Sequence, residues 1–305
     1  VLLLIIMLTV LLGTLYPLML EALGGGKISV GSPYFSLVFI PLMIPVIILV
    51  GIGSVSRWRE DTISNLSKQL RTPAILAVVF ASVSLLFLPG KMSFTAWFAL
   101  LLAFWVINSL FMQLKKRLRH SKNLLQDLKR TPRGWYGMIL AHMGLSFTVI
   151  GIALSSVYSQ EQDVHMLKGD DRTLGEYRFE LVDVERITGP NYKADMGTIR
   201  IYKNEKELMT LHPEKRIYNV RKNVMTEASI HSNLLRDLYV SLGEQRDINT
   251  GAWSVRLYYK PFILWIWLGG FVMVLGGSLA LTDKRYRTSL KQEEIKLDDN
   301  NVIAN

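Results

Sequence analysis

Cysteine is absent from the 305-residue sequence, and this absence excludes several kinds of chemistry. Without cysteine the chain cannot form disulfides, bind metals through thiolates or use a cysteine nucleophile, whatever its compartment. Any redox chemistry would therefore need a bound cofactor.

Charged residues are missing from long apolar parts of the chain. Six stretches without Asp, Glu, Lys or Arg lie at about 1–20, 36–54, 73–90, 95–112, 136–157 and 261–282. Each is close to the ~20 residues that a helix needs to cross about 30 Å of hydrocarbon. Pro41 and Pro45 are expected to kink the second stretch, which membrane helices tolerate when neighbours satisfy the freed carbonyls. The sequence therefore predicts a polytopic α-helical membrane protein with six spans.

The first stretch also lacks the marks of a signal peptide. It has no initiating Met, no basic region before the apolar run and no cleavage site after it. We therefore interpret it as a membrane span. Because the chain begins inside this span, we expect it to be part of something longer.

Lys and Arg are distributed unevenly between the connections. They are frequent at 55–72, 113–135 and 283–305, whereas the short loops between the other spans hold only Lys27 and Lys91. The positive-inside rule places the basic connections in the cytoplasm. Both termini are then cytoplasmic, and residues 158–260 lie on the other side of the membrane.

The net charge of +10 belongs entirely to the parts that flank the membrane. Residues 158–260 contain sixteen Lys plus Arg and sixteen Asp plus Glu, so this region is neutral. A nucleic-acid partner is therefore not supported. The basic run in the cytoplasmic connection sets the topology and is available to contact anionic membrane lipid.

The region 158–260 has the period-two pattern of β-strands. Tyr177, Phe179 and Leu181 alternate with charged residues, and the phase then slips by one, as a β-bulge would allow. Alternation recurs in TIRIYK (198–203) and AWSVRLYY (252–259), with turn signals between the strands. We predict an inserted small antiparallel β-barrel or sandwich domain, with one possible helix around 232–242.

His142 is the only histidine inside a predicted span. Ionisable groups in membrane spans are costly and usually face a functional interior, and neutral imidazole is a common axial ligand of haem. The alternative is a histidine that only hydrogen-bonds a neighbouring helix. Gly137, Gly144 and Gly151 recur every seven residues on a face nearly opposite His142, where we expect another helix to pack closely.

The other histidines give weaker signals. His165, His212 and His231 lack metal-ligand spacing and are expected to be surface or turn residues, and His120 lies in the basic run and is expected to be solvated. Five aromatic residues gather near the return to the membrane, where an interfacial belt is favoured over a stacking surface for a porphyrin. They are Trp253, Tyr258, Tyr259, Trp265 and Trp267.

Several long strings resemble one protein family. They are TVLLGTLYPL, ISVGSPYF, WYGMILAHMGLSFTVIGIALS, GEYRFELVDVERITGPNY, EKRIYNV, MTEASI and GAWSVRLYYKPFILWIWLGGFVMVLGGSLALTDKRYR. Together they are similar to the C-terminal portion of CcmF, the haem-lyase component of the bacterial System I cytochrome c maturation pathway, which is related to NrfE. The resemblance extends along essentially the whole chain.

The resemblance implies a function and its partners. Such a protein would sit in the bacterial inner membrane with the β-domain in the periplasm, and would work with CcmH and CcmI. It would take haem from holo-CcmE and attach it to the CxxCH cysteines of apocytochrome c. A resident haem b is held in this family by two histidines inside spans, and the AH[LM]G string of the second falls on His142.

This sequence also departs from the family pattern. It contains no tryptophan-rich WWD segment, no external haem histidine and no second histidine for the resident haem. We expect an N-terminal half of CcmF to supply these parts, so that this chain alone would be inactive. A rival hypothesis is a scaffold whose β-domain binds partners while all haem contacts lie in the other half. A secondary transporter is disfavoured because no span carries a charge and no inverted repeat is visible.

Overall fold

The computed structural model describes residues 1–56, 62–88, 90, 92–119, 126, 130–220, 222–247 and 251–283. His120, Lys91 and the tail after Asp283 lie outside these ranges, so the expectations for them stay predictions. The chain divides into two compact units. One unit consists of Val1–Leu88, Trp97–Val149 and Gly269–Asn305, and the other of Pro89–Ala96 and Ile150–Leu268.

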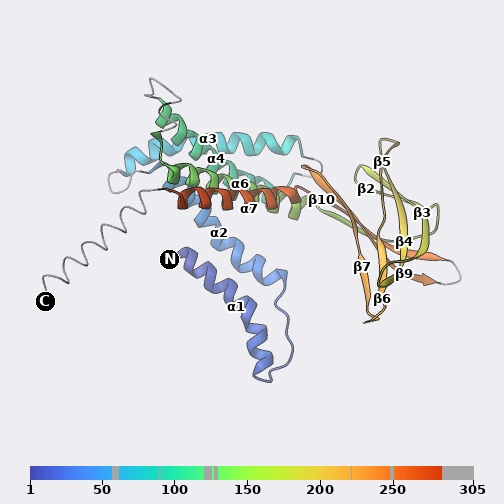
Figure 1. Cartoon of the computed structure of the whole chain (residues 1–305). Helices are drawn as coiled ribbons and strands as arrows, with labels where there is room; N and C mark the ends of the chain where they lie inside the picture. The colour runs from blue at the N-terminus through green and yellow to red at the C-terminus, as the bar shows by residue number, and fades with distance from the viewer. Residues whose placement is uncertain are drawn as a thin grey trace. The chain divides into compact units, whose positions relative to one another are not determined.

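Six helices among the described residues are long and apolar enough to cross a membrane. They are α1 (Leu2–Ala22), α2 (Ser32–Val55), α3 (Ile63–Leu86), α4 (Phe94–Leu118), α6 (Arg133–Tyr158) and α7 (Ile263–Leu281). Four of them, α3, α4, α6 and α7, run alongside one another (Figure 1). The prediction of six spans is therefore confirmed. Pro41 and Pro45 lie inside α2, and the kink expected there stays a prediction.

Helices α3 and α4 extend furthest beyond the apolar stretches that predicted them. Helix α3 begins at Ile63, where the Thr62 side chain accepts a hydrogen bond of 3.3 Å from the Asn65 amide, and it continues through Pro73. Helix α4 extends past residue 112 to Leu118. Both extensions are polar, so hydropathy could not detect them, but a side-chain cap and basic residues in the last turn stabilise such helix ends.

Helices α2, α4 and α6 share an apolar core. Ile47 from α2 and Val106 from α4 are buried, and Met143 from α6 packs against them. Trp105 crosses between two of these helices, because its indole Nε1 donates a hydrogen bond of 3.1 Å to the Ile48 carbonyl. Gly51 makes this approach possible, since a Cβ at that position would stand 2.1 Å from the indole nitrogen.

The opposite face of α6 packs against α7 through glycine. A Cβ added to Gly137 would lie 2.5 Å from the Gly276 carbonyl oxygen, and one added to Gly144 would lie 2.5 Å from that of Gly269. Further along α6, a Cβ on Gly151 would meet Ile266 at 2.8 Å. The glycine seam predicted from the sequence is therefore confirmed, and its partner is the last helix of the chain.

Asp283, just after α7, stabilises the start of α6. Its Oδ2 accepts a hydrogen bond of 2.9 Å from the amide of Gly134, in the first turn of that helix. The first amides of a helix lack partners within it and favour a negative charge nearby. The buried Asp283 carboxylate therefore links the two helices at one end of their seam.

The described residues of the second unit form ten antiparallel strands in two sheets. They are β1 (Gln160–Met166), β2 (Asp171–Leu174), β3 (Tyr177–Thr188), β4 (Tyr192–Lys203), β5 (Lys206–Leu211), β6 (Glu214–Tyr218), β7 (Val224–Glu227), β8 (Ser229–Ser232), β9 (Arg236–Asp247) and β10 (Ala252–Pro261). One sheet has the order β1-β10-β9-β8, and the other has the order β2-β3-β4-β6-β7 with β5 also paired to β4.

The two sheets enclose one apolar core, so the fold is a β-sandwich. Phe179 and Ile201 from one sheet face Leu238 and Leu257 from the other, and all four are fully buried. The predicted bulge is confirmed, because the register between β3 and β4 shifts between Leu181 and Asp183.

The expected helix around 232–242 is wrong, because this segment is the turn into β9 and most of that strand. Asn233 Oδ1 accepts hydrogen bonds from the amides of Leu235 and Arg236, at 2.9 and 2.8 Å, and so ends β8. Leu238 and Leu242 then point into the core with a period of two. Pairing with β10 and β8 satisfies the backbone, which favours a strand over a helix here.

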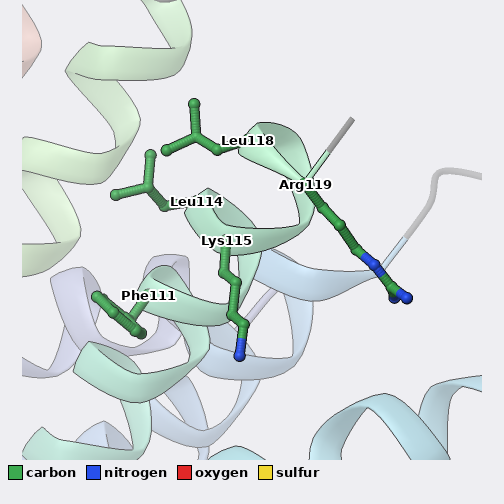
Figure 2. A pocket seen from close by; sticks show the side chains of 5 residues that line it. All are labelled: Phe111, Leu114, Lys115, Leu118 and Arg119. Carbon is green, nitrogen blue, oxygen red and sulfur yellow. The ribbon is translucent and has the colours of Figure 1, made fainter. Parts of the chain in front are cut away.

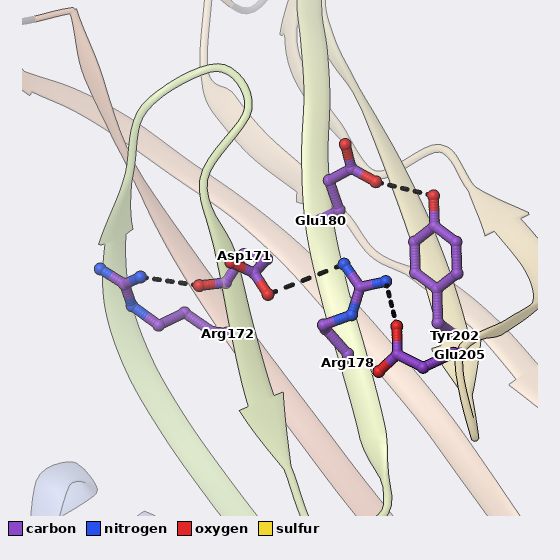
Figure 3. A network of polar contacts seen from close by, with 6 residues as sticks. All are labelled: Asp171, Arg172, Arg178, Glu180, Tyr202 and Glu205. Carbon is purple, nitrogen blue, oxygen red and sulfur yellow. Dashed lines mark hydrogen bonds and ion pairs between the residues drawn. The ribbon is translucent and has the colours of Figure 1, made fainter.

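Charged side chains of opposite sign link the strands on the outer surface of this domain (Figure 3). The guanidinium of Arg178 forms ion pairs with Asp171 at 3.7 Å and Glu205 at 3.3 Å, and it lies 4.2 Å from the centre of the Tyr202 ring. The Tyr202 hydroxyl donates to Glu180 at 2.7 Å, and this bond raises the pKa of the tyrosine. Exposed pairs of this kind contribute at most about 1 kcal/mol each, so they fix strand neighbours more than they stabilise the fold.

Candidate functional site

His142 lies on α6 and is half-buried, on the side away from the glycine seam. Its Nδ1 lies 3.4 Å from the Oγ of Ser54, a buried residue on α2. The Ser54 hydroxyl also contacts the Val50 carbonyl, to which it donates a hydrogen bond of 2.7 Å.

These two contacts favour one tautomer of the imidazole. A serine hydroxyl has one proton to donate, and Ser54 gives it to the Val50 carbonyl. With that bond formed, the hydroxyl oxygen acts as the acceptor toward His142, which favours the tautomer with its proton on Nδ1. In the neutral ring Nε2 then has its lone pair free, which is the form that binds a metal.

The surroundings hold the histidine in place without competing for Nε2. Ser146, one turn later on α6, is buried and donates a hydrogen bond of 3.1 Å to the backbone carbonyl of His142. Ile139 and Met143, which lie near His142 on α6, pack into the core shared with α2 and α4. Among the described residues, no hydrogen bond to Nε2 is recorded.

A hollow of about 240 Å³ opens beside Ser54. We call it the basic pocket, and its polar lining consists mainly of Ser54, Gln113, Lys116, Arg117 and Trp135. No Asp or Glu occurs among the described residues that line it. The serine that orients His142 is thus also part of the wall of a cationic pocket.

The cations of the basic pocket are held by neutral partners. Arg117 donates from Nε to the Thr131 hydroxyl at 3.0 Å, and its guanidinium lies 5.1 Å from the centre of the Trp135 ring. Lys116 donates to the Gln69 side chain at 3.0 Å. These contacts position both charges but do not neutralise them.

Helix α4 carries polar groups into its buried face. Asn108 Nδ2, Ser109 Oγ and Gln113 Oε1 are buried and have no hydrogen-bond partner among the described residues. Buried polar groups normally find a partner in the protein, in water or in a ligand. Gln113 lines the basic pocket, so its carboxamide is within reach of a bound molecule there.

The last turns of α4 separate apolar from basic side chains (Figure 2). Phe111, Leu114 and Leu118 project to one side, while Lys115 and Arg119 turn away from them. Phe111 is 62% exposed, as expected for a helix face that meets lipid or another polypeptide. The basic side chains are therefore available at this end of the helix.

The remaining histidines are not brought together. His212 Nδ1 lies 3.5 Å from the Thr198 hydroxyl, whereas His231 Nδ1 accepts a hydrogen bond of 2.9 Å from Arg236. His165 lies on β1. The described residues contain no cluster of three or more His, Cys, Asp or Glu that could hold a metal ion.

The aromatic residues near the return to the membrane are dispersed. Tyr258 packs edge-on against Tyr239 with the ring centres 4.8 Å apart, and Tyr259 stacks on Tyr177 at 5.9 Å. Trp265 donates from its indole to the Leu234 carbonyl at 3.0 Å. Most of these rings are thus engaged within the β-domain and its junction with α7, so they do not form one stacking surface.

The sequence did not single out Ser54, or the pair Lys116 and Arg117. A serine in an apolar span has no motif of its own, and the two basic residues belong to a run that the positive-inside rule explains. One signal was available, because Ser54 and Ser56 end an apolar helix. Only packing brings Ser54 against His142.

Comparison with known proteins places these features in a wider context. Residues 157–261 match the family model described as "CcmF C-terminal beta-sandwich". The chain is 44% identical over 284 residues to the cytochrome c-type biogenesis protein CcmF of Pseudomonas aeruginosa, covering 92% of the chain and 42% of that relative. It is 41% identical over 298 residues to CcmF of Escherichia coli K12, covering 96% of the chain and 44% of that relative.

A solved structure has the same fold. The chain aligns with "Cytochrome c Heme Lyase CcmF" with a TM-score of 0.68 and 22% identity, over 90% of the chain and 43% of that structure. These matches confirm the resemblance seen in the sequence strings, and with the six apolar helices they identify a multi-pass membrane protein. The chain spans less than half the length of the curated relatives it matches.

Proposed function

Since this chain is a homologue of the C-terminal portion of the CcmF family of cytochrome c-type biogenesis proteins, we propose that it is part of a haem lyase. In this proposal His142 is one axial ligand of a resident haem b. The second ligand and the residues that hold the incoming haem come from the N-terminal half. The complex takes haem from holo-CcmE, works with CcmH and CcmI, and attaches the haem to the CxxCH cysteines of apocytochrome c.

The contact between Ser54 and His142 is the observation that carries this proposal. A metal-binding histidine usually donates its other ring N–H to an acceptor, which fixes the tautomer and the direction of the ring. Ser54 can be this acceptor at 3.4 Å when its own proton goes to the Val50 carbonyl. The half-buried imidazole thus fits the role of a haem ligand better than that of a general acid or base.

Haem bound at such a histidine would supply a redox-active iron, and the protein would supply its ligand and surroundings. The close seam with α7 supports the role of α6 as a rigid support. Because Gly137 and Gly144 contact Gly276 and Gly269 directly, α6 has little freedom to shift along α7. The direction of the His142 side chain is therefore fixed from both sides of its helix.

We further infer an orientation in the bacterial inner membrane. Lys115, Lys116, Arg117 and Arg119 end α4, which supports a cytoplasmic location for that end by the positive-inside rule. Residues 158–260 are then periplasmic, and their β-sandwich serves as the docking platform for the other maturation proteins.

Replacement of His142 by Ala in the assembled, haem-containing complex tests the proposal. The variant is expected to lose the absorption bands of the resident haem, while the complex still assembles in the membrane. The matched control is His212→Ala, because His212 lies in the β-domain, where its side chain contacts the Thr198 hydroxyl. If the His142→Ala complex keeps its resident haem, the chain is a scaffold and the ligand role is wrong.

A further inference from the structure

The basic pocket has a charge that the described protein does not balance. Lys116 and Arg117 both line it, and their recorded partners are the neutral side chains of Gln69, Thr131 and Trp135. Both side chains are exposed, and two neighbouring cations with no acidic side chain in the described pocket lining favour an anion between them. Because these contacts hold both side chains before any ligand arrives, an anion would find its donors already placed.

The donors suit a carboxylate. An arginine guanidinium can bind a carboxylate through two parallel N–H donors, and a lysine ammonium adds a mobile point charge. Arg117 uses Nε for Thr131, which leaves the two terminal nitrogens of its guanidinium directed elsewhere. The Gln113 side chain lines the same wall, and its amide Nε2 is the group that could donate to a carboxylate, since its buried Oε1 can only accept.

The pocket also has a defined position relative to His142. Trp135 precedes His142 by seven residues on α6, so the two side chains share one face and are separated by roughly 10 Å along the helix axis. Ser54 belongs to both places, since it lines the pocket and contacts His142. A ligand that binds in the pocket and at Nε2 would need a carboxylate end and an iron end.

Haem has this combination, because its two propionate carboxylates project from one edge of the ring while the iron lies at its centre. We propose that Lys116 and Arg117 bind the propionates of the haem whose iron His142 ligates. The inference rests on the proposed function of His142. It adds a second point of attachment, which sets the rotation of the ring about the bond between iron and imidazole.

A phospholipid phosphate would also attract these two cations. The position of the pocket favours the propionates, because its wall includes the hydroxyl that contacts the iron-binding imidazole. Lys115 and Arg119 do not line the basic pocket; they line a neighbouring hollow of about 550 Å³, which Lys116 and Gln113 also line. All four cations are exposed, so a lipid headgroup would be expected to use Lys115 and Arg119 as well as Lys116 and Arg117.

The test compares the double variant Lys116→Gln, Arg117→Gln with the matched control Lys115→Gln, Arg119→Gln in the assembled complex. Both remove the same charge from the same end of α4. Each complex is stripped of haem and titrated with protohaem or with its dimethyl ester, which has no free carboxylates, and binding is followed by absorbance. We expect the first variant to bind protohaem roughly tenfold or more weakly than the control, as loss of charge-assisted hydrogen bonds predicts.

The dimethyl ester shows whether weaker protohaem binding comes from lost carboxylate contacts or from a misfolded complex. It should bind the variant and the control equally, because it cannot use Lys116 or Arg117. An equal loss for protohaem and the ester, or no loss for either, overturns the proposal. The titrations are repeated with phosphatidylglycerol in place of phosphatidylcholine as the added lipid. If the weaker protohaem binding of the Lys116, Arg117 variant then disappears, the pocket binds lipid and the proposal is overturned.

The His142→Ala experiment tests the iron ligand independently of the haem titration of the Lys116, Arg117 variant. If His142→Ala abolishes haem binding and the Lys116, Arg117 variant does not weaken it, only the propionate site is wrong. If His142→Ala retains the resident haem, the proposed function itself fails. The two experiments therefore distinguish the ligand from the carboxylate site.

Discussion

The Oγ of Ser54 lies 3.4 Å from Nδ1 of His142, although 88 residues separate them in the chain. Replacement of Ser54 by Ala would leave the Nδ1 proton without its acceptor. Loss of such outer partners typically lowers metal affinity by about 10- to 100-fold, and we expect resident haem to be retained less well by a similar factor. The reduction potential should rise, because the imidazole becomes a weaker electron donor.

Haem retention during dialysis and a spectroscopic redox titration would measure these two effects. Ser67→Ala is the control, since the Ser67 hydroxyl also bonds a carbonyl in its own helix, that of Ser64 at 2.9 Å, but has no recorded contact with a histidine. An unchanged potential in Ser54→Ala would contradict the positioning role of Ser54.

Gly276 and Gly277 are adjacent on α7 but differ completely in their surroundings. A Cβ on Gly276 would lie 2.5 Å from the Ala141 amide nitrogen, whereas one on Gly277 would meet nothing within 4 Å. Gly276→Ala should therefore push α6 and α7 apart and destabilise the protein by about 1–3 kcal/mol. Gly277→Ala should be neutral, or stabilise the helix by up to ~1 kcal/mol.

Thermal unfolding of the two variants in the same detergent would measure this difference. Equal unfolding temperatures would show that the seam tolerates a methyl group, and would remove the argument that α7 holds α6 rigidly.

Asp183 gives the β-sandwich a dependence on pH. Lys168 donates a hydrogen bond of 2.9 Å to its Oδ2, and the Val184 amide donates one of 2.8 Å to Oδ1, so the pKa of this carboxyl lies below its ordinary value. A carboxyl with a depressed pKa adds stability above the unfolded pKa of about 3.9 and loses it as the pH falls through the folded pKa. Asp183→Asn should therefore be less stable than the wild type at neutral pH, with the difference disappearing in acid.

Thermal unfolding between neutral and acid pH would test this, with Lys168→Gln as the comparison. Removal of the lysine should raise the pKa of Asp183 toward its ordinary value, while the bond from the Val184 amide keeps part of the shift. A stability difference between Asp183→Asn and the wild type that does not change with pH would contradict the assignment.

Local patterns predicted much of the fold because their causes are local. Six uncharged apolar stretches predicted six spans, and the phase slip after Leu181 predicted the bulge in β3. Helix geometry alone placed Gly137 and Gly144 on one face, where α7 now packs. Each of these predictions depends only on residue type and on the period of a helix or strand.

The segment 232–242 failed because its local pattern is ambiguous. The leucines at 234, 235, 238 and 242 also fit one face of a helix. The Asn233 turn and pairing on both sides of β9 decide in favour of a strand. Strand pairing is a contact between distant segments, so no local period could reveal it.

The sequence by itself determined the membrane architecture, the neutral β-domain, the family and the choice of His142 as the candidate ligand. Only the tertiary structure brings Ser54 from another helix against Nδ1 of His142, while the Ser54 hydroxyl donates to the Val50 carbonyl. It also decided that Lys116 and Arg117 share a pocket with Ser54 and Trp135. Protonation states and binding pockets arise where helices meet, and the order of residues along one helix does not contain that information.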